Sequence, residues 1–296
     1  MEILQALKLS LVIFIMGNLL GVGLKLNPEQ ALKGLRDVRF VFFTLLWGFV
    51  FGPALALAIT LFIPLEPPFA LGLILLGMAP SAPFLPVLVN RVKGDMGYTA
   101  GFMLLTSMVT VLFIPLVVPL LGNGLSVSPW TIARPLLFLI LLPLAMGMAM
   151  LRWRPKQGTA FYPMVKKVTT LFGISSAALS VAAYGRGMMV EVGSFPIIAQ
   201  FIFFGVMAAA SYWLSFGVKQ EQRIIISMGM CTRNLGAALA PLFALTAVDE
   251  RAIVMVMIGL PFMIIFAMLV SKISVNRPVV ADLYAPLPVM APKKGL

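Results

Sequence analysis

Long apolar stretches alternate with short polar segments along almost the whole chain. Nine of these stretches are apolar on every helical face and are long enough, at roughly 20 residues, to cross a membrane as helices. Strand-like alternation is absent, and a backbone in lipid must satisfy its polar groups internally, which favours helices. The nine predicted spans are Ala6–Leu24, Arg39–Ile63, Phe69–Val92, Gly97–Leu121, Trp130–Leu151, Val165–Tyr184, Ser194–Phe216, Gln222–Leu245 and Ala252–Lys272.

Composition agrees with a protein embedded in a bilayer. Of the 296 residues, 61% are hydrophobic and only 11% are charged, and the mean hydropathy is +1.04. An average soluble domain carries about 25% charged residues, so a globular cytoplasmic enzyme is excluded. The chain has no histidine and one cysteine, Cys231. An intramolecular disulfide and a histidine-based metal or catalytic site are therefore excluded as well.

The basic residues are placed unevenly between the two sides of the predicted membrane. If the first segment lies outside and the spans alternate, 17 of the 22 basic residues fall on the inner side and Arg233 falls inside a span. The four outer residues are Lys8, Arg134, Arg186 and Arg251. An excess of Lys and Arg marks the cytoplasmic side. The bias predicts a cell (inner) membrane protein with its N-terminus outside and its C-terminus in the cytoplasm. The net charge of +12 then reflects topology, and nucleic acid is not an expected partner.

Two of the nine spans are interrupted. The span at residues 69–92 carries Pro80, Pro83 and Pro86. Prolines at this spacing cannot lie in one continuous helix, because each removes a donor and clashes one turn back. The span at residues 222–245 gathers small and polar residues around Arg233 at mid-membrane depth. Such breaks are tolerated in lipid only where the backbone is buried in protein or lines a cavity.

The two interrupted spans lie five apart, so they cross the membrane in opposite directions. Two broken helices of opposite polarity indicate a secondary transporter built from inverted repeats, with its substrate site near the midplane. The repeats would hold four and five spans. The alternative is that both are only kinked structural helices. We expect one transmembrane domain over residues 1–272, whose core helices include 69–92 and 222–245, followed by a flexible cytoplasmic tail at residues 273–296.

Three stretches of the chain resemble bacterial members of the bile acid:sodium symporter family, and the likeness covers almost the whole length. They are Leu19–Pro28, with a Gly-hydrophobe-Gly-Leu motif; Gly72–Pro80, closed by Val92–Asp95; and Met228–Ala240. The resemblance implies an all-α polytopic fold of two inverted repeats, arranged as a panel and a core domain, with the broken helices crossing in the core. It also implies secondary active transport of a small organic anion, bile-acid-like or another carboxylate, by alternating access.

The chain departs from this family at the positions that the resemblance assigns to sodium. Leu85 and Pro86 stand where sodium-using members have two ion ligands, and Ser227 stands where they have a membrane glutamate. The family's Gln-Asn pair is Cys231 and Thr232 here. Sodium prefers several hard oxygen ligands, and none of the ten acidic residues is expected at mid-membrane depth. The sequence therefore predicts weak or absent sodium coupling.

Several alternatives stay open at this point. A sodium-coupled symporter with a rebuilt ion site would use candidates among Ser227, Thr99, Cys231 and Met228. Sodium is the one cofactor to consider, and the expected partners are a small organic anion and membrane lipid. Cys231 is more simply explained as a small packing residue. A membrane sensor of the same fold is a candidate of a different class. An enzyme is not expected, because no nucleophile–base pair is present.

Arg233 is the most informative single residue. A mid-membrane arginine costs at least about 2.5–3.5 kcal/mol on insertion scales, and the sequence offers no intramembrane acid to pair with it. Two interpretations follow: a contact for an anionic substrate, or a fixed structural cation where relatives bind sodium. The expected substrate-binding residues are Arg233, Thr232, Asn234, Ser81 and Asn18. The uncharged residues among them could instead cap half-helices or bond a neighbouring helix.

Overall fold

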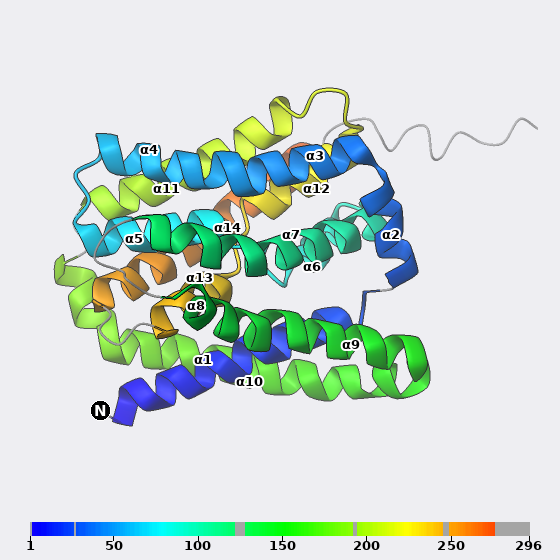
Figure 1. Cartoon of the computed structure of the whole chain (residues 1–296), viewed down its shortest axis with the longest axis horizontal. Helices are drawn as coiled ribbons and strands as arrows, with labels where there is room; N and C mark the ends of the chain where they lie inside the picture. Colours follow the sequence, from blue (N-terminus) through cyan, green and yellow to red (C-terminus); the bar gives the residue numbers. More distant parts are fainter. Residues whose placement is uncertain (1, 27, 122–127, 192–193, 245–248, 276–296) are drawn as a thin grey trace, which may run out of the picture.

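The computed structural model describes residues 2–26, 28–121, 128–191, 194–244 and 249–275, and their regular structure is helical (Figure 1). The α-helices are α1 (Glu2–Gly23), α2 (Pro28–Arg36), α3 (Val38–Leu45), α4 (Gly52–Phe62), α5 (Pro67–Met78), α6 (Leu85–Arg91), α7 (Met96–Val117), α8 (Pro129–Leu136), α9 (Leu142–Trp153), α10 (Pro155–Glu191), α11 (Ser194–Trp213), α12 (Gln220–Met230), α13 (Leu235–Ala244) and α14 (Glu250–Val275). The π-helical turns η1 (Leu46–Phe51) and η3 (Leu137–Leu141) join α3 to α4 and α8 to α9, and the 3₁₀ turn η2 (Val118–Leu121) extends α7.

Six helical segments are long and apolar enough to cross a membrane. They are Gln5–Gly23, Val38–Phe62, Met96–Leu120, Pro129–Trp153, Phe195–Trp213 and Glu250–Ser274. The shorter helix α5 is also apolar. The protein is therefore a polytopic α-helical membrane protein, as the hydropathy pattern predicted.

The helices pack in two groups. Helix α1 packs against α9 and α10, and these three lie together along one side of the molecule (Figure 1). On the other side, α5 packs against α4 and α14, and α11 packs against α12 and α14. The groups meet where α8 contacts α7 and α13. The short helix α13 is buried along most of its length, whereas α6 buries Leu85 and Val89 and exposes Val87.

Both predicted breaks are real interruptions of a helix. Helix α5 ends at Met78 and α6 begins at Leu85, with the first two of the three closely spaced prolines in the segment between them. Helix α12 ends at Met230 and α13 begins at Leu235. The proline spacing explains the first break, since each proline removes one helical hydrogen bond and its ring clashes with the carbonyl one turn back.

Three features differ from the sequence-based expectations. The segment predicted as the span Val165–Tyr184 is part of α10, which runs for 37 residues from Pro155 to Glu191 and is not among the six segments above. The two π-helical turns were not predicted by the hydrophobic pattern. Helix α14 continues to Val275, so residues 273–275 of the expected flexible tail are helical. The rest of that tail, residues 276–296, lies outside the described residues.

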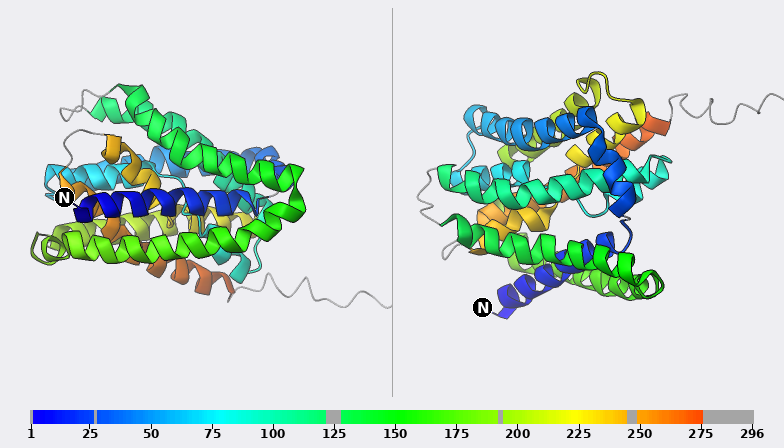
Figure 2. Two further views of the ribbon diagram at one scale, coloured as in Figure 1. Left: turned by 90° about the horizontal axis from the view of Figure 1, so that it is seen from below. Right: turned by 45° about the vertical axis from the view of Figure 1, so that its right-hand side comes forward.

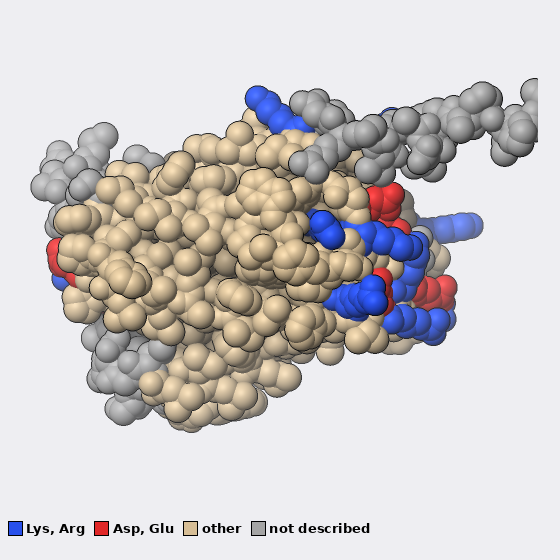
Figure 3. Space-filling view, turned by 90° about the horizontal axis from the view of Figure 1, so that it is seen from above, with Lys and Arg blue, Asp and Glu red and all other residues tan. Residues whose placement is uncertain are grey.

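Charge is concentrated at one end of the molecule. Lys and Arg side chains gather at the end that carries α2, whereas the face between the two ends is almost uncharged (Figure 3). At the opposite end, Arg251 forms ion pairs with Glu66 and Asp249. The uneven placement of basic residues along the sequence thus corresponds to one basic end in space.

Glycine allows unusually close packing between α1 and α9. A Cβ added at Gly147 would lie 2.4 Å from the carbonyl oxygen of Leu20, and one at Gly23 would lie 2.3 Å from that of Leu144. Real Cβ atoms do not approach a backbone so closely, so larger residues would force the helices apart. Small residues at such contacts are a common feature of helix pairs in membranes.

Replacing Gly147 with alanine should destabilise the protein, because α1 and α9 must separate to admit the methyl group. Overpacking of this kind costs about 1–3 kcal/mol. The control is Gly158→Ala on α10, where a Cβ would have its nearest neighbours at 3.5 Å. That variant should be neutral or slightly more stable, because alanine favours a helix. Thermal unfolding in detergent checks both, and equal melting temperatures would contradict the packing argument.

Candidate functional site

The two breaks lie side by side and antiparallel. Ser81 and Arg233 form an isolated antiparallel bridge between them. Two backbone hydrogen bonds flank this bridge: the amide of Ala82 donates to the carbonyl of Thr232 at 3.0 Å, and the amide of Asn234 donates to the carbonyl of Pro80 at 2.7 Å. We call residues 79–84 and 231–234 the crossing. At the crossing, backbone groups freed from one broken helix form hydrogen bonds with those freed from the other, so these groups are satisfied inside the membrane.

Arg233 is buried at the crossing, with 2% of its surface exposed. Its Nη1 donates to the carbonyl oxygen of Ala79 at 2.8 Å, and Ala79 is the residue that caps the C-terminus of α5. A helix C-terminus carries partial negative charge, so a guanidinium there is favourably placed. The guanidinium carbon lies 5.9 Å from the ring centroid of Phe203, and the backbone amide of Arg233 donates to the sulfur of Met263 at 2.9 Å.

Several hydrogen-bond donors at the crossing have no partner within the described protein. They are the Nε and Nη2 atoms of Arg233, the hydroxyl of Ser81 and the Nδ2 atom of Asn234. All three residues are at most 5% exposed. No ion pair involving Arg233 is found among the described residues. A buried donor left unbonded costs about 1–3 kcal/mol, so this arrangement is complementary to an acceptor that carries negative charge.

Glycines in α4 and α5 make room for the guanidinium. A Cβ at Gly52 would lie 2.9 Å from Nη2 of Arg233 and 2.7 Å from the carbonyl oxygen of Gly77. A Cβ at Gly77 would in turn lie 3.0 Å from the carbonyl oxygen of Gly52. Gly52 was not among the residues expected at the site, because its position four residues after Gly48 is only a weak signal of close packing.

The remaining polar residues of the second break mainly cap the half-helices on either side of it. The hydroxyl of Thr232 donates to the carbonyl of Met228 at 2.7 Å, and Cys231 is fully buried with its sulfur 3.5 Å from the same carbonyl. The Oδ1 atom of Asn234 accepts from the amide of Ala237 at 3.2 Å, in the first turn of α13. Capping thus accounts for the hydroxyl of Thr232 and for the Oδ1 atom of Asn234, whereas the Nδ2 atom of Asn234 has no partner among the described residues.

Of the four other candidates, Met228 is fully buried in α12, and its carbonyl is the acceptor for Thr232 and Cys231. Asn18, Ser227 and Thr99 lie outside this set. Each donates to a backbone carbonyl: Asn18 to Phe14 at 3.0 Å, Ser227 to Ala208 at 2.7 Å and Thr99 to Asp95 at 2.8 Å. Asn18 and Thr99 therefore bond within their own helices, and Ser227 bonds across to α11. The hydroxyls of Ser227 and Thr99 do not share a partner, and the described residues contain no group of three or more acidic or cysteine side chains that could hold a metal ion.

Comparison with known families decides the wider context. Residues 11–191 match the sodium bile acid symporter family. The chain belongs to the sodium bile acid symporter family. Its members are membrane transporters rather than enzymes. The matched region contains the first break and ends before the second, which holds Arg233. A comparison with curated proteins finds no match.

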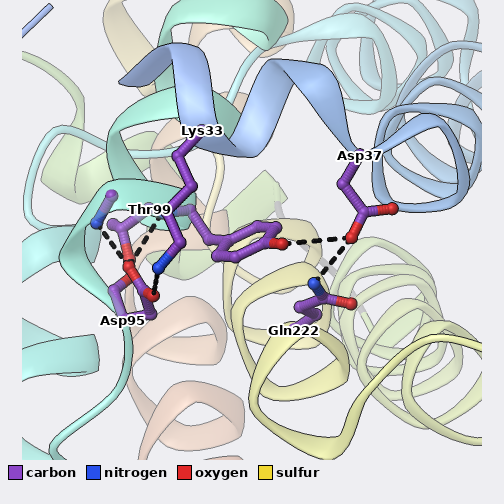
Figure 4. Close-up of polar contacts among 7 residues, drawn as sticks. Lys33, Asp37, Asp95, Thr99 and Gln222 are labelled. Carbon is purple, nitrogen blue, oxygen red and sulfur yellow. Dashed lines mark hydrogen bonds and ion pairs between the residues drawn. The ribbon is translucent and has the colours of Figure 1, made fainter. Parts of the chain in front are cut away.

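In this member of the sodium bile acid symporter family, a polar network ties the start of α12 to its neighbours (Figure 4). Asp37, which caps α3, accepts from the hydroxyl of Tyr98 at 3.1 Å and from Nε2 of Gln222 at 2.8 Å. Next to it, Lys33 and Asp95 form an ion pair at 2.9 Å. Asp95 also caps α7, and Thr99 lies in the same helical turn. The network thus fixes the N-terminal end of the second broken helix.

Hydrogen bonds lower the pKa values of both carboxylates in the network, Asp37 and Asp95. Burial raises the pKa of Asp37, but hydrogen bonds from the amide of Phe40, from Gln222 and from Tyr98 lower it by more, so the net pKa lies below the ordinary value. Burial also raises the pKa of Asp95, and the hydrogen bond from Lys33 leads the group of contacts that lower it overall. Both groups therefore favour the folded protein in their charged forms.

Asp37→Asn should destabilise the protein at neutral pH while keeping a side chain that can cap α3. We expect a loss of about 1 kcal/mol, typical of a hydrogen bond to a charged group that is partly exposed. Because the folded pKa is depressed, the stabilisation is complete above the unfolded pKa of about 3.9 and disappears as pH falls through the folded pKa.

Melting temperatures of the parent and the variant between pH 7 and pH 3 test this expectation. The difference should be constant at the upper end and should shrink at the lower end. The exposed residue Glu221, which precedes Gln222 in the first turn of α12, supplies the control, since Glu221→Gln should change the melting temperature little. A difference between parent and Asp37→Asn that is independent of pH would show that charge has no part in the network.

Proposed function

We propose that the protein is a secondary active transporter that moves a small organic anion, bile-acid-like or another carboxylate, by alternating access. The observation that carries this proposal is the set of unpartnered donors around Arg233 where the two breaks pair. Membership of the sodium bile acid symporter family supplies the transporter class. The donors supply the preference for negative charge.

Electrostatics at the crossing favour an anion in two independent ways. The guanidinium is permanently charged and has five donors, of which Nη1 bonds Ala79. Helix α13 begins directly after Asn234, and the N-terminus of a half-helix carries partial positive charge. In transporters with broken helices such N-termini face the anionic groups of substrates. A carboxylate can accept two parallel hydrogen bonds from one guanidinium, which makes Arg233 the expected primary contact.

The same arginine gives a reason for weak or absent sodium coupling. In the proposed mechanism its guanidinium supplies the positive charge at the C-terminus of α5 that sodium supplies in relatives. Sodium would need several oxygen ligands and compensating carboxylates. Ser227 and Thr99, the candidates for a rebuilt sodium site, each donate to a different backbone carbonyl. A fixed internal cation therefore replaces a bound one.

The proposed architecture has nine spans arranged as inverted repeats of four and five. In it, α5–α6 and α12–α13 are the corresponding broken helices, the group around α5 and α11 is the core, and α1, α9 and α10 belong to the panel. The basic end in Figure 3 is placed in the cytoplasm of the cell, because Lys and Arg accumulate on that side. The N-terminus then lies outside.

Transport should be almost independent of sodium. Uptake of radiolabelled organic anions into proteoliposomes should change less than about tenfold, a coupling of about 1.4 kcal/mol, when sodium replaces choline. A larger increase would contradict the proposal and would favour a sodium site rebuilt around Ser227 and Thr99.

Substitutions at Arg233 separate its two roles. Arg233→Lys keeps the charge and loses the planar fork, so it should weaken substrate binding at least about tenfold with a smaller effect on stability. Arg233→Gln should reduce both, because the carbonyl of Ala79 loses its cationic partner. Arg223→Lys, on the same broken helix but outside the crossing, is the control. Normal folding and normal anion binding in both Arg233 variants would show that Arg233 is not part of the substrate site.

Reporter fusions test the orientation. A reporter that is active only in the cytoplasm should be active when fused after Leu296 and inactive when fused before Ala6, because 17 of the 22 basic residues would otherwise face outward. Activity of both reporters, before Ala6 and after Leu296, would exclude an odd number of spans.

A further inference from the structure

Helix α1 is packed so closely on α9 and α10 that the three helices form one rigid group. The view from below in Figure 2 shows α1 lying between α9 and α10. Towards α9, neither Gly23 nor Gly147 leaves room for a Cβ beside the opposite backbone. Towards α10, a Cβ at Gly173 would lie 2.8 Å from the ring of Phe14. Interiors packed at this density resist sliding, so α1 keeps its place on its two neighbours.

Helix α1 also contacts α13, which packs on α5 and α14 in the other group. The contact is made by Ile15, which is 3% exposed. The three atoms nearest to a Cβ at Gly236 would all belong to Ile15, with Cδ1 at 2.6 Å and Cγ2 at 3.1 Å. Gly236, in the first turn of α13, is therefore a socket for the isoleucine side chain.

This socket adjoins the crossing. Gly236 follows Asn234 by two residues, and the first hydrogen bond within α13 runs from the amide of Ala238 to the carbonyl of Asn234. The amides of Leu235 and Gly236 therefore have no acceptor inside the helix. Free amides at a helix N-terminus attract anions. An apolar side chain thus rests on the turn that an anionic substrate at the crossing would approach.

The crossing is closed in the described arrangement. Arg233, Asn234 and Ser81 are at most 5% exposed, although each carries a donor without a partner in the described protein. The glycines that make room for the guanidinium, Gly52 and Gly77, lie on α4 and α5 and so belong to one packed group. The contact of α1 with α13, in contrast, lies between the two groups. The site can open there without separating helices of the same group.

We propose that Ile15 is the gate residue of the substrate site and that Gly236 is its socket. The contact is made while the site is closed, and it breaks when α1, α9 and α10 move away from α13 as a unit. Ile15 has no polar side-chain atom to offer the free amides, so an anion that takes its place gains hydrogen bonds that the closed site lacks. The inference rests on the proposed transport function, but the separation of Ile15 from Gly236 can be measured without a substrate.

Thiol accessibility tests whether the contact opens. In a Cys231→Ser background, the thiol of Ile15→Cys should react with a water-soluble methanethiosulfonate reagent in the absence of any anion, because opening admits water between the two groups. Leu73→Cys is the matched control, since Leu73 has 0% exposure within the other group, on α5. Its thiol should react at least about tenfold more slowly, because only unfolding of the group would expose it. Equal rates for the two thiols would overturn the proposal.

A disulfide tests whether the opening is needed for transport. In the same background, Ile15→Cys with Gly236→Cys brings the two Cβ atoms within reach of the roughly 3.5–4.5 Å that a disulfide needs. Oxidation should lower uptake of radiolabelled cholate into proteoliposomes at least about tenfold, and reduction should restore it, because the closed state cannot exchange its substrate. The control pair, Gly21→Cys with Val165→Cys, joins α1 to α10 within one group, where a Cβ at Gly21 would lie 3.7 Å from Cγ1 of Val165. Its oxidation should leave uptake unchanged.

The outcomes separate the gate from the transport function. Undiminished uptake by the oxidised Ile15→Cys/Gly236→Cys protein, or failure of that disulfide to form, would overturn the proposal. A reactive Ile15→Cys thiol together with no cholate uptake by the unmodified protein would support the gate and would count against the proposed transport of bile-acid-like anions.

Discussion

The structure depends on a buried arginine, Arg233, that has no acidic partner within the described part of the chain. Arg233 lies at the crossing and can be accommodated there because the break after α5 frees the carbonyl of Ala79. The dependence is mutual. Without a cation, the C-terminus of α5 would end inside the bundle with unbonded carbonyls, and without the breaks the guanidinium would have no acceptor at mid-membrane depth. The glycines at positions 52 and 77 provide the space that this arrangement requires.

The two edges of the Arg233 guanidinium have different surroundings. One residue can therefore act both as a structural cation and as a contact for an anionic substrate. One edge bonds the end of a half-helix, as a structural cation would. On the other edge, Nε and Nη2 have no hydrogen-bond partner among the described residues, and Nη2 lies next to Gly52. A transporter that needs positive charge at its crossing can obtain it from a bound ion or from its own chain. In the proposed mechanism Arg233 supplies this charge, which therefore stays permanently at the site.

The features that the sequence could predict are those with a strong local signal. Three prolines at intervals of three residues predict a break wherever they occur, and an arginine flanked by Thr232 and Asn234 stands out in an apolar span. The two breaks could be expected to meet because each frees backbone groups that need partners. Asn18 and Thr99 carried the same polar signal, but their side chains bond backbone carbonyls of their own helices. Only the three-dimensional contacts distinguish these cases.

The partners of Arg233 that could not be predicted from the sequence are backbone or apolar groups. The carbonyl of Ala79, the ring of Phe203 and the sulfur of Met263 contact Arg233, and each belongs to a residue type that fills every span of this chain.

Chemical rescue of Arg233→Ala tests most directly whether a tethered cation replaces a bound one. The variant should unfold at a lower temperature than the parent in buffer free of small cations. Millimolar guanidinium should restore both its melting temperature and its binding of organic anions, with no effect on the parent at the same concentration. Parent-like stability and anion binding of Arg233→Ala without any added cation would contradict the account.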